Sequence, residues 1–323
     1  MSDIKPFISV VIPSYNQGSY IDDAIFSILC QSYKNVEIIV IDGGSADDTV
    51  IKLQAWGDRI TWISESDDGQ TDALIKGFSR ASGEWLTWLN SDDFQADHAL
   101  HRVAAAINKN PHAEVVLGNG HYARQDGTFL RPYPRVDVGP DVDMRQEFFL
   151  KGFVAQPSVY FKRSAYMDVG GVNPERHFCM DYDLWVRLAD RGSVFVGLDH
   201  DISGNRWYHD TKTATQTLQL YAEAVATQVE MYGKVSPYFV QAISNHLFAI
   251  FHGHFQTTRN HLFLRWLWFK AVWTVLNHRT PGYCLKGLVK ETISKSDPVI
   301  GDTLRYRDLV AGVCKRLGKK IGR

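Results

Sequence analysis

The first ninety residues alternate between two kinds of pattern, and this alternation constrains the fold more than any other feature. Nearly continuous apolar runs at 7–15, 36–45, 60–66 and 84–93 are typical of strands buried on both faces. The segments between them, at 19–33, 45–56 and 69–82, read as helices, and Ser45 is a good N-cap for the second of these. Alternating strands and helices predict an α/β fold with a doubly wound, mostly parallel sheet.

Polar residues end each of these strands, at 13–16, 42–45, 65–68 and 90–93, and the last three ends are acidic. Ligands of doubly wound sheets bind beyond the carboxyl ends of the strands, so these ends should converge on one edge. Carboxylates prefer hard cations such as Mg²⁺ or Mn²⁺, and the pair Asp92 and Asp93 could hold one beside a diphosphate. Taken alone, the pair could equally be a solvated turn.

Charge divides the chain into two regions. Residues 1–210 hold 19 basic and 30 acidic side chains, whereas residues 211–323 hold 16 basic and 6 acidic ones. The same boundary separates the α/β pattern from long helical patterns, so we expect a catalytic domain at 1–210 and a basic, mainly helical region at 211–323. The basic region could lie on an anionic membrane or attract a diphosphate-bearing lipid. It could also be a helical bundle with a solvated basic face. No nucleic-acid partner is expected.

The expected location is the cytoplasm, with possible peripheral contact on the inner face of the cell membrane. The four cysteines, Cys30, Cys179, Cys284 and Cys314, are scattered without a CxxC motif, as is typical of reduced thiols. The N-terminal apolar run is too short for a signal peptide, and no uninterrupted apolar stretch reaches the ~18 residues of a spanning helix.

Three ordered motifs resemble family 2 glycosyltransferases, which are inverting enzymes with a GT-A fold. The first is "VVIPSYNQGSYIDDAIFSILCQSYKNVEIIVIDGGSADDT", the second is "SESDDGQTDALIKGFSRASGEWLTWLNSDD" and the third is "MDYDLWVRLADRG". The resemblance covers roughly residues 7–209. One departure is Ile75, which stands where many relatives have Asn in a "DAxNKG" pattern.

The resemblance implies a nucleotide-sugar site that includes Pro13, Tyr15, Asp42, Asp67 and Asp92. Tyr15 would stack on the base, and Asp42 would accept a hydrogen bond from the imide N–H of uracil or thymine. The alternatives are a buried core tyrosine and a helix-capping aspartate.

The resemblance also implies a site for Mn²⁺ or Mg²⁺. Asp93 would bind the divalent metal directly, with Asp92 facing the ribose and the metal. His209 would be a further metal ligand, although a lone histidine can equally be structural.

The third motif implies that Asp181 is the general base that takes the proton of the acceptor hydroxyl. Asp183 is the local alternative; the two point about 200° apart on a helix, so only one can face the cleft. Asp183 is expected to cap the helix or form a salt bridge. Gln156 and Trp185 are candidate acceptor-binding residues, with a plain turn and core packing as their alternatives.

Together these features predict an inverting glycosyltransferase of the hexosyltransferase type. It would move a sugar from a nucleotide-diphosphate donor, with a UDP-sugar favoured, to a glycan or lipid-linked oligosaccharide in surface polysaccharide synthesis. The alternatives are a sugar-nucleotide-binding protein with a degenerate site and a nucleotidyltransferase. A Rossmann NAD enzyme is disfavoured because no GxGxxG follows the first strand.

Overall fold

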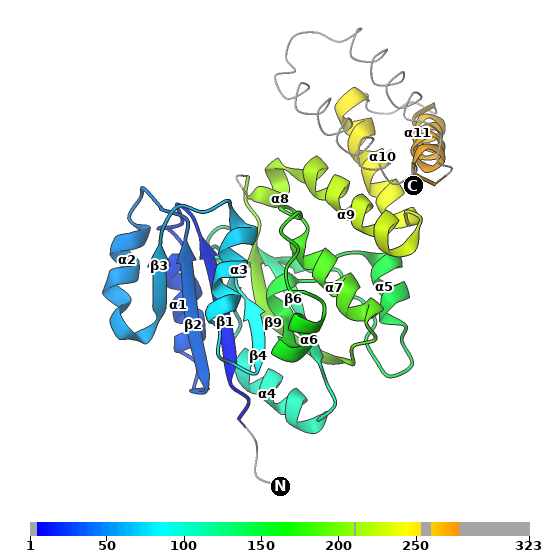
Figure 1. The fold of residues 1–323 in the computed structure, drawn as a ribbon. Helices are drawn as coiled ribbons and strands as arrows, with labels where there is room; N and C mark the ends of the chain where they lie inside the picture. Colours follow the sequence, from blue (N-terminus) through cyan, green and yellow to red (C-terminus); the bar gives the residue numbers. More distant parts are fainter. Residues whose placement is uncertain (1–4, 210, 253–259, 278–323) are drawn as a thin grey trace. The chain divides into compact units, whose positions relative to one another are not determined.

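The computed structural model describes residues 5–209, 211–252 and 260–277 (Figure 1). The chain divides into two compact units, Met1–Thr215 and Gln216–Arg323. The functional assignment of the two regions stays a prediction. The first unit carries the α/β pattern and every predicted site residue.

One mixed sheet forms the centre of the first unit. Its first strands, β1 (Ile8–Ser14), β2 (Val36–Asp42), β3 (Thr61–Ser64) and β4 (Trp85–Trp88), are mutually parallel in the order β3-β2-β1-β4. The sheet continues through β8 (Val159–Lys162), β6 (Val115–Ala123), β9 (Phe195–Arg206) and β5 (Phe94–Gln95), while β7 (Phe129–Pro132) pairs with β6. The β8 strand is antiparallel to its neighbours and β9 is parallel to β6. The predicted α/β class with a mostly parallel sheet is confirmed.

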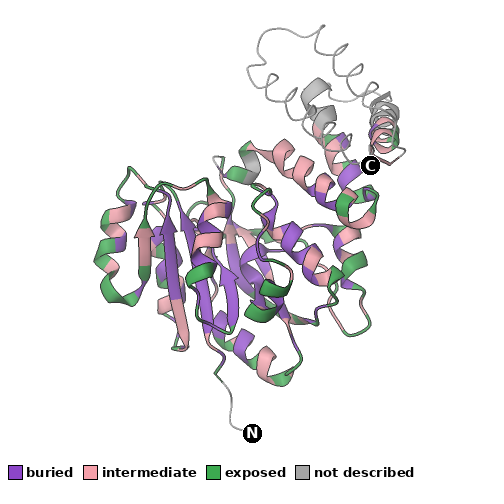
Figure 2. Ribbon diagram, viewed as in Figure 1, coloured by how far each residue is buried: buried purple, intermediate pink, exposed green. Residues whose placement is uncertain are grey.

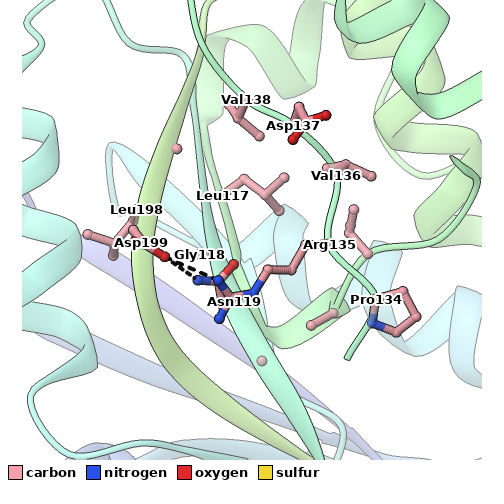
Figure 3. A pocket seen from close by; sticks show the side chains of 14 residues that line it. Leu117, Gly118, Asn119, Pro134, Arg135, Val136, Asp137, Val138, Leu198 and Asp199 are labelled. Carbon is pink, nitrogen blue, oxygen red and sulfur yellow. Dashed lines mark hydrogen bonds and ion pairs between the residues drawn. The ribbon is translucent and has the colours of Figure 1, made fainter. Parts of the chain in front are cut away.

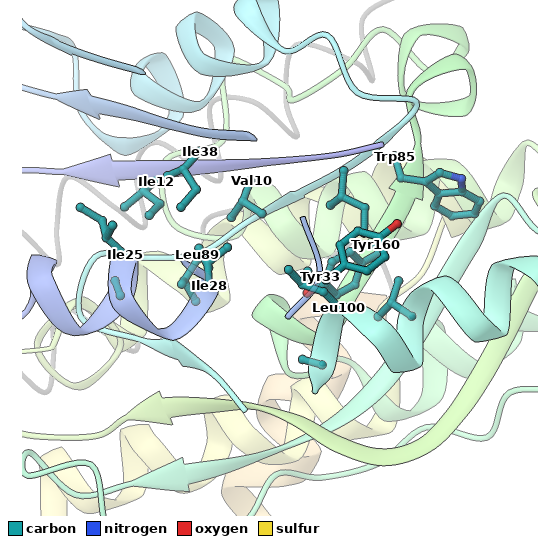
Figure 4. Close-up of a cluster of buried hydrophobic side chains, with 14 of the residues drawn as sticks. Val10, Ile12, Ile25, Ile28, Tyr33, Ile38, Trp85, Leu89, Leu100 and Tyr160 are labelled. Carbon is teal, nitrogen blue, oxygen red and sulfur yellow. The ribbon is translucent and has the colours of Figure 1, made fainter. Parts of the chain in front are cut away.

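Helices cover both faces of this sheet. They are α1 (Ile21–Leu29), α2 (Thr49–Trp56), α3 (Gln70–Arg80), α4 (Ala99–Lys109), α5 (Met144–Lys151), α6 (Arg163–Asp168) and α7 (Met180–Asp190), with 3₁₀ turns at Gly57–Arg59 and Gln156–Ser158. The short helix α8 (Lys212–Thr215) follows β9 in the chain. The α1 and α4 helices pack on one face, where Ile25 and Leu100 join Val10 in a buried apolar cluster (Figure 4). The other face holds a cluster of aromatic rings from α3, α6, α7 and the sheet.

Burial explains why the central strands read as continuous apolar runs. Every residue of β1 is buried, as Figure 2 shows for most of the central sheet. Because helices cover both faces, alternate side chains meet apolar partners on each side. Each fully buried Val or Ile contributes about 1.5–3 kcal/mol relative to exposure. This rigid sheet holds the strand ends in place.

The second unit contains α9 (Thr217–Tyr232), α10 (Pro237–His252) and α11 (Asn260–Asn277). The α9 helix ends at Gly233, whose positive φ of 70° suits a glycine after a helix. The side-chain oxygen of Asn277 accepts a hydrogen bond from the backbone N–H of Val235 at 2.8 Å, which ties the end of α11 to the start of α10. Among the described helices, none combines the length and apolar character needed to span a membrane. The basic tail at 314–323 lies outside the described residues.

Candidate functional site

The predicted convergence of polar strand ends is confirmed by the strand register. Ser14 at the end of β1 pairs with Asp42 at the end of β2, and Asp42 pairs with Ser64 at the end of β3. The β4 strand runs parallel beside β1, and the backbone N–H of Leu89 continues the ladder to Val11. The residues after β1, β2, β3 and β4 therefore emerge at one edge of the sheet.

Asp42 lies fully enclosed at this edge. Its carboxylate accepts hydrogen bonds from the backbone N–H of Ser45 (2.9 Å), the Ser45 hydroxyl and the Ser64 hydroxyl (2.6 Å). Ser45 also accepts the backbone N–H of Asn16 at 2.7 Å, so the loop after β2 is bonded to the loop after β1. A nucleotide base could reach Asp42 only if one of these serines moved.

These bonds correct the prediction that Ser45 caps the second helix. The α2 helix begins four residues later, at Thr49, with Asp48 at the N-cap position. The Ser45 hydroxyl is occupied by Asp42 and Asn16, and Asp47 instead accepts the backbone N–H of Thr49 at 3.0 Å. The loop between β2 and α2 is therefore part of the site edge.

Asp67, after β3, lies directly beside the Asp42 loop. A Cβ added to Gly43 would stand 2.9 Å from Asp67 Oδ2, so a larger residue there would displace the Asp67 carboxylate. Burial raises the pKa of Asp67; the Gly69 N–H and the charge of Lys76 oppose the shift, and the charges of Asp72 and Asp42 add to it. The Gly69 N–H bonds to Oδ1 at 2.8 Å.

Tyr15 follows β1 and is 61% exposed, so its ring is open to a planar ligand. The alternative of a buried core tyrosine is thereby contradicted. Pro13 behaves differently, because it is buried within β1 opposite Ile41. Its contact with the nucleotide stays a prediction.

The turn after β4 holds its two carboxylates in different environments. Asp93 is only 4% exposed, and its two oxygens accept hydrogen bonds from the backbone N–H of Arg206 (2.8 Å) and the side-chain amide of Asn90 (3.1 Å). Asp92 is half-buried, and its Oδ2 accepts the hydroxyl of Tyr208 at 3.0 Å. Asp92 is thus the more accessible carboxylate of the pair.

The two carboxylates also perturb one another. Burial, followed by the adjacent charge of Asp92, raises the pKa of Asp93 well above its usual range. Burial likewise raises the pKa of Asp92, with the Tyr208 hydrogen bond and the Arg206 charge opposing the shift. Two carboxylates pressed together in this way favour a bound positive charge.

Arg206, which sequence reasoning missed, organises this turn from the end of β9. Its buried guanidinium donates to the backbone carbonyl of Asp92 (2.8 Å), the backbone carbonyl of Gln125 (3.1 Å) and the carboxylate of Asp23 (2.6 Å). It therefore links the β4 turn to α1 and to the β6–β7 hairpin. No local signal marks this role, because its partners lie 81–183 residues away in the sequence.

The segment before α7 is bonded to the same edge. Gln70 donates to Asn90 Oδ1 at 2.7 Å, and Lys212 donates both to Gln70 Oε1 at 3.1 Å and to the backbone carbonyl of His177. The Thr71 hydroxyl adds a bond to the backbone carbonyl of Arg176 at 2.6 Å. These contacts hold the start of α7 beside the β4 turn.

Asp181 is the second residue of α7 and is half-buried. Asp183, its local alternative, is 3% exposed and lies 2.7 Å from the guanidinium of Arg187 and 3.6 Å from that of Arg176. The expected salt-bridge role of Asp183 is confirmed. Of the two carboxylates, Asp181 is the one with exposed surface.

The two predicted acceptor residues are both buried. Trp185 is 1% exposed and stacks on Trp88 with 5.4 Å between ring centroids, because this face of α7 packs on the sheet. Gln156 is 7% exposed and donates to the backbone carbonyl of Trp88 at 2.8 Å. Gln156 Oε1 and Trp185 Nε1 are each buried without a hydrogen-bond partner among the described residues. Both residues pack against the sheet, and their contact with the acceptor stays a prediction.

His209 lies exposed in the turn after β9, one residue beyond Tyr208. Within the part of the chain that the structure describes, no group of three or more His, Cys, Asp or Glu side chains could hold a metal ion. The role of His209 stays a prediction.

Comparison with known proteins agrees with this architecture. An uncharacterised glycosyltransferase of Rickettsia typhi is 28% identical over 227 residues, which cover 68% of this chain and 69% of that protein. The structure of residues 1–349 of Staphylococcus aureus TarS in complex with UDP-GlcNAc matches with a TM-score of 0.54 and 15% identity, over 86% of this chain and 80% of that one. A longer TarS chain also matches, and the present chain covers 44% of its length.

The mannosyltransferase PcManGT of Pyrobaculum calidifontis, in complex with GDP-Man and Mn²⁺, matches with a TM-score of 0.56 and 15% identity, over 95% of this chain and 81% of that one. These structural likenesses establish a GT-A type of fold. The family model for Glycosyl transferase family 2 matches residues 9–170, which is half of the chain. The chain belongs to glycosyl transferase family 2.

Proposed function

We propose that this glycosyltransferase moves a sugar from a nucleoside-diphosphate donor, with a UDP-sugar favoured, to a hydroxyl of a glycan or lipid-linked oligosaccharide in surface polysaccharide synthesis. The observation that carries the proposal is the single sheet edge where exposed Tyr15 and half-buried Asp67 and Asp92 meet the start of the Asp181 helix. The UDP-GlcNAc complex of TarS, which has the same fold, supports a UDP-sugar.

The residues at this edge fit a divalent cation whose coordination is completed by oxygens of the substrate. Mg²⁺ is commonly bound through one or two carboxylates plus substrate phosphates, so a site without three protein ligands is compatible with it. The Mn²⁺ complex of PcManGT supports the same metal class. When bound, the cation would neutralise charge on the departing nucleoside diphosphate.

Asp92 is proposed as the principal metal-binding carboxylate because it has the exposed surface. Asp93 would hold the shape of the turn, since both of its oxygens already have donors. This reverses the division of labour inferred from the sequence. Tyr15 would stack on the base, Asp67 would contact the nucleotide, and His209 would add a ligand from the exposed turn.

The reaction would be a single displacement with Asp181 as general base. The acceptor hydroxyl gives its proton to the Asp181 carboxylate while its oxygen bonds to the anomeric carbon. The bond from that carbon to the diphosphate oxygen breaks on the opposite side, which inverts the anomeric configuration. A half-buried carboxylate suits this task because partial desolvation strengthens it as a base.

The test is a panel of UDP-sugars with Mn²⁺, a mixture of candidate acceptors, and detection of released UDP. We expect one donor to give transfer and Asp181→Asn to bind UDP normally while losing at least 100-fold in transfer rate. Asp97→Asn, at an exposed position outside the site, is the matched control. Full transfer by Asp181→Asn would refute the base assignment. Binding of UDP without turnover of any donor would favour a binding protein.

A further inference from the structure

A cavity lies between the sheet and the segment that follows β7 (Figure 3). Its volume is about 340 Å³, within the range of small-molecule sites, which is about 300–1,000 Å³. The walls come from residues 117–120 of β6, 197–199 of β9, the crossing segment 134–138, and residues 154–155. None of the residues assigned to the donor or the base lines it.

Glycines shape the floor of this cavity. A Cβ on Gly197 would lie 3.1 Å from the Cβ of Val138, and a Cβ on Gly120 would lie 2.6 Å from that of Ala155. Any larger residue would push the crossing segment or residue 155 away from the sheet. The close approach of these segments, and with it the shape of the cavity, therefore depends on the two glycines.

The polar side of the cavity carries both donors and acceptors. Asp199 Oδ1 accepts the side-chain amide of Asn119 at 3.1 Å and the guanidinium of Arg135 at 3.3 Å, as the dashed lines in Figure 3 mark for Asn119. Asp137 forms an ion pair with Lys151 at 2.6 Å. The side chain of Asp199 is 92% exposed, so the rest of its carboxylate faces solvent.

These charges select the class of ligand. Each carboxylate already has a cationic partner, so the lining offers no surplus positive charge to a phosphate or a nucleotide. Aliphatic side chains alternate with these polar ones along the same segments, namely Leu117, Val136, Val138, Val154 and Leu198. A ligand that presents C–H groups and hydroxyls side by side matches such a mixed lining. A neutral carbohydrate has this chemistry, whereas a lipid tail has no hydroxyl to offer the exposed carboxylate of Asp199.

Three aromatic rings, two half-buried and one exposed, lie between the cavity and the reaction edge. The backbone N–H of Tyr133 bonds to Gly120 in the cavity wall at 3.0 Å, and the Tyr133 ring stacks on Tyr122 at 4.6 Å. Trp207, 37% exposed, packs edge-on against Tyr122 at 5.6 Å and stands between Arg206 and Tyr208 in the chain. The guanidinium of Arg131 lies 3.9 Å from the Tyr122 ring centre, so the exposed Trp207 is the ring of this group that is offered to a sugar. Aromatic faces attract the C–H groups of sugars because the ring face is electron-rich.

The distance along β6 between the cavity and the reaction edge fits an extended ligand. Asn119 is four residue steps along β6 from Ala123, the register partner of Arg206, which amounts to about 13 Å of strand. We propose that the cavity binds a sugar unit of a neutral carbohydrate acceptor, remote from the hydroxyl that reacts. This inference rests on the proposed transfer to a carbohydrate.

The test is saturation-transfer NMR on the full chain with maltotriose, cellotriose and chitotriose as probes, in the presence of UDP. We expect at least one trisaccharide to bind the wild type. Val136→Trp, which fills the cavity, and Asp199→Ala, which removes its exposed acceptor, should each lower the signal at least fivefold. The matched controls are Ile51→Trp and Asp58→Ala, at exposed positions outside the cavity.

Binding of UDP by every variant, measured in parallel, shows that each is folded and that the donor edge is intact. The inference is overturned if no trisaccharide binds the wild type, or if Val136→Trp binds as strongly as Ile51→Trp. Failure of the wild type to bind UDP, with trisaccharide binding still sensitive to Val136→Trp, would overturn the proposed donor and leave the carbohydrate site standing.

Discussion

At the scale of single residues, the two adjacent aspartates after β4 differ in what they can do. Asp92 has exposed surface, while Asp93 is enclosed by the backbone of Arg206 and the amide of Asn90. The sequence identifies both as chemically important but contains nothing that separates them. Their difference depends on β9, which reaches the turn from more than a hundred residues away.

This difference predicts opposite phenotypes for two similar variants. Asp92→Asn should abolish the Mn²⁺ dependence of UDP binding and leave the melting temperature nearly unchanged. Asp93→Asn should lower the free energy of unfolding by about 1–3 kcal/mol, because an amide places a donor against the Asn90 amide. Differential scanning fluorimetry with and without UDP and Mn²⁺ measures both effects. The reverse pattern would return the direct metal contact to Asp93.

At the scale of elements, apolar patterns that reflect burial predict the positions of strands better than capping residues predict the starts of helices. The central strands were identified because helices cover them on both faces, so their apolar runs are continuous. The β9 strand was not predicted, since its charged and glycine-rich middle is exposed and lacks alternation. The start of α2 was misplaced because Ser45 bonds to Asp42 rather than to the helix. A capping signal is local, and a tertiary hydrogen bond can override it.

Glu37 shows how one side chain fastens several elements at the edge opposite the site. Its Oε1 accepts hydrogen bonds from the Ser9 hydroxyl (2.5 Å), the Ser82 backbone N–H (2.7 Å) and the Gly83 backbone N–H (3.2 Å), which join β2 to β1 and to the approach to β4. Burial alone would raise the pKa of Glu37, but these hydrogen bonds hold it below its ordinary value.

The sign of the pH effect follows from that shift. The folded-state pKa of Glu37 lies below its unfolded value of about 4.3. Its contribution to the free energy of unfolding is therefore complete above the unfolded pKa and is lost as the pH falls through the folded pKa. Glu37→Gln should cost about 1–2 kcal/mol at pH 7 and flatten the acid end of the stability profile. Urea unfolding of the wild type and of Glu37→Gln, from neutral to acid pH, measures this effect. Glu84→Gln, at an exposed position nearby, is the control. Equal acid slopes for wild type and Glu37→Gln would contradict it.

At the scale of the whole molecule, the change in net charge near residue 210 lies close to the boundary between the two compact units near residue 215. The α/β unit is acidic overall and places several carboxylates at its site edge, which suits a cation and a diphosphate. The region from residue 211 onward carries ten more basic than acidic side chains. Charge of one sign gathered in one part of a chain attracts surfaces of the opposite sign over a distance set by salt.

That basic surplus predicts salt-sensitive attraction to anionic membranes. Each Lys or Arg near such a surface contributes about 1 kcal/mol, so a basic cluster can hold a protein without a spanning helix. At low ionic strength the full chain should sediment with phosphatidylglycerol vesicles, stay in solution with phosphatidylcholine vesicles, and be released by salt. Replacing Lys315, Arg316, Lys319 and Lys320 by Gln should weaken binding at least tenfold.

The matched control replaces the same number of exposed basic residues in the α/β unit, namely Lys34, Arg59, Arg80 and Lys109. Both variants lose the same net charge, so a difference between them locates the attraction in the C-terminal region rather than in the charge of the whole molecule. Equal binding of the two variants, or no preference for anionic vesicles, would contradict the prediction and favour a basic surface that is simply solvated. A positive result would give a lipid-linked acceptor a physical route to the site, because its diphosphate and the enzyme would be concentrated on the same surface.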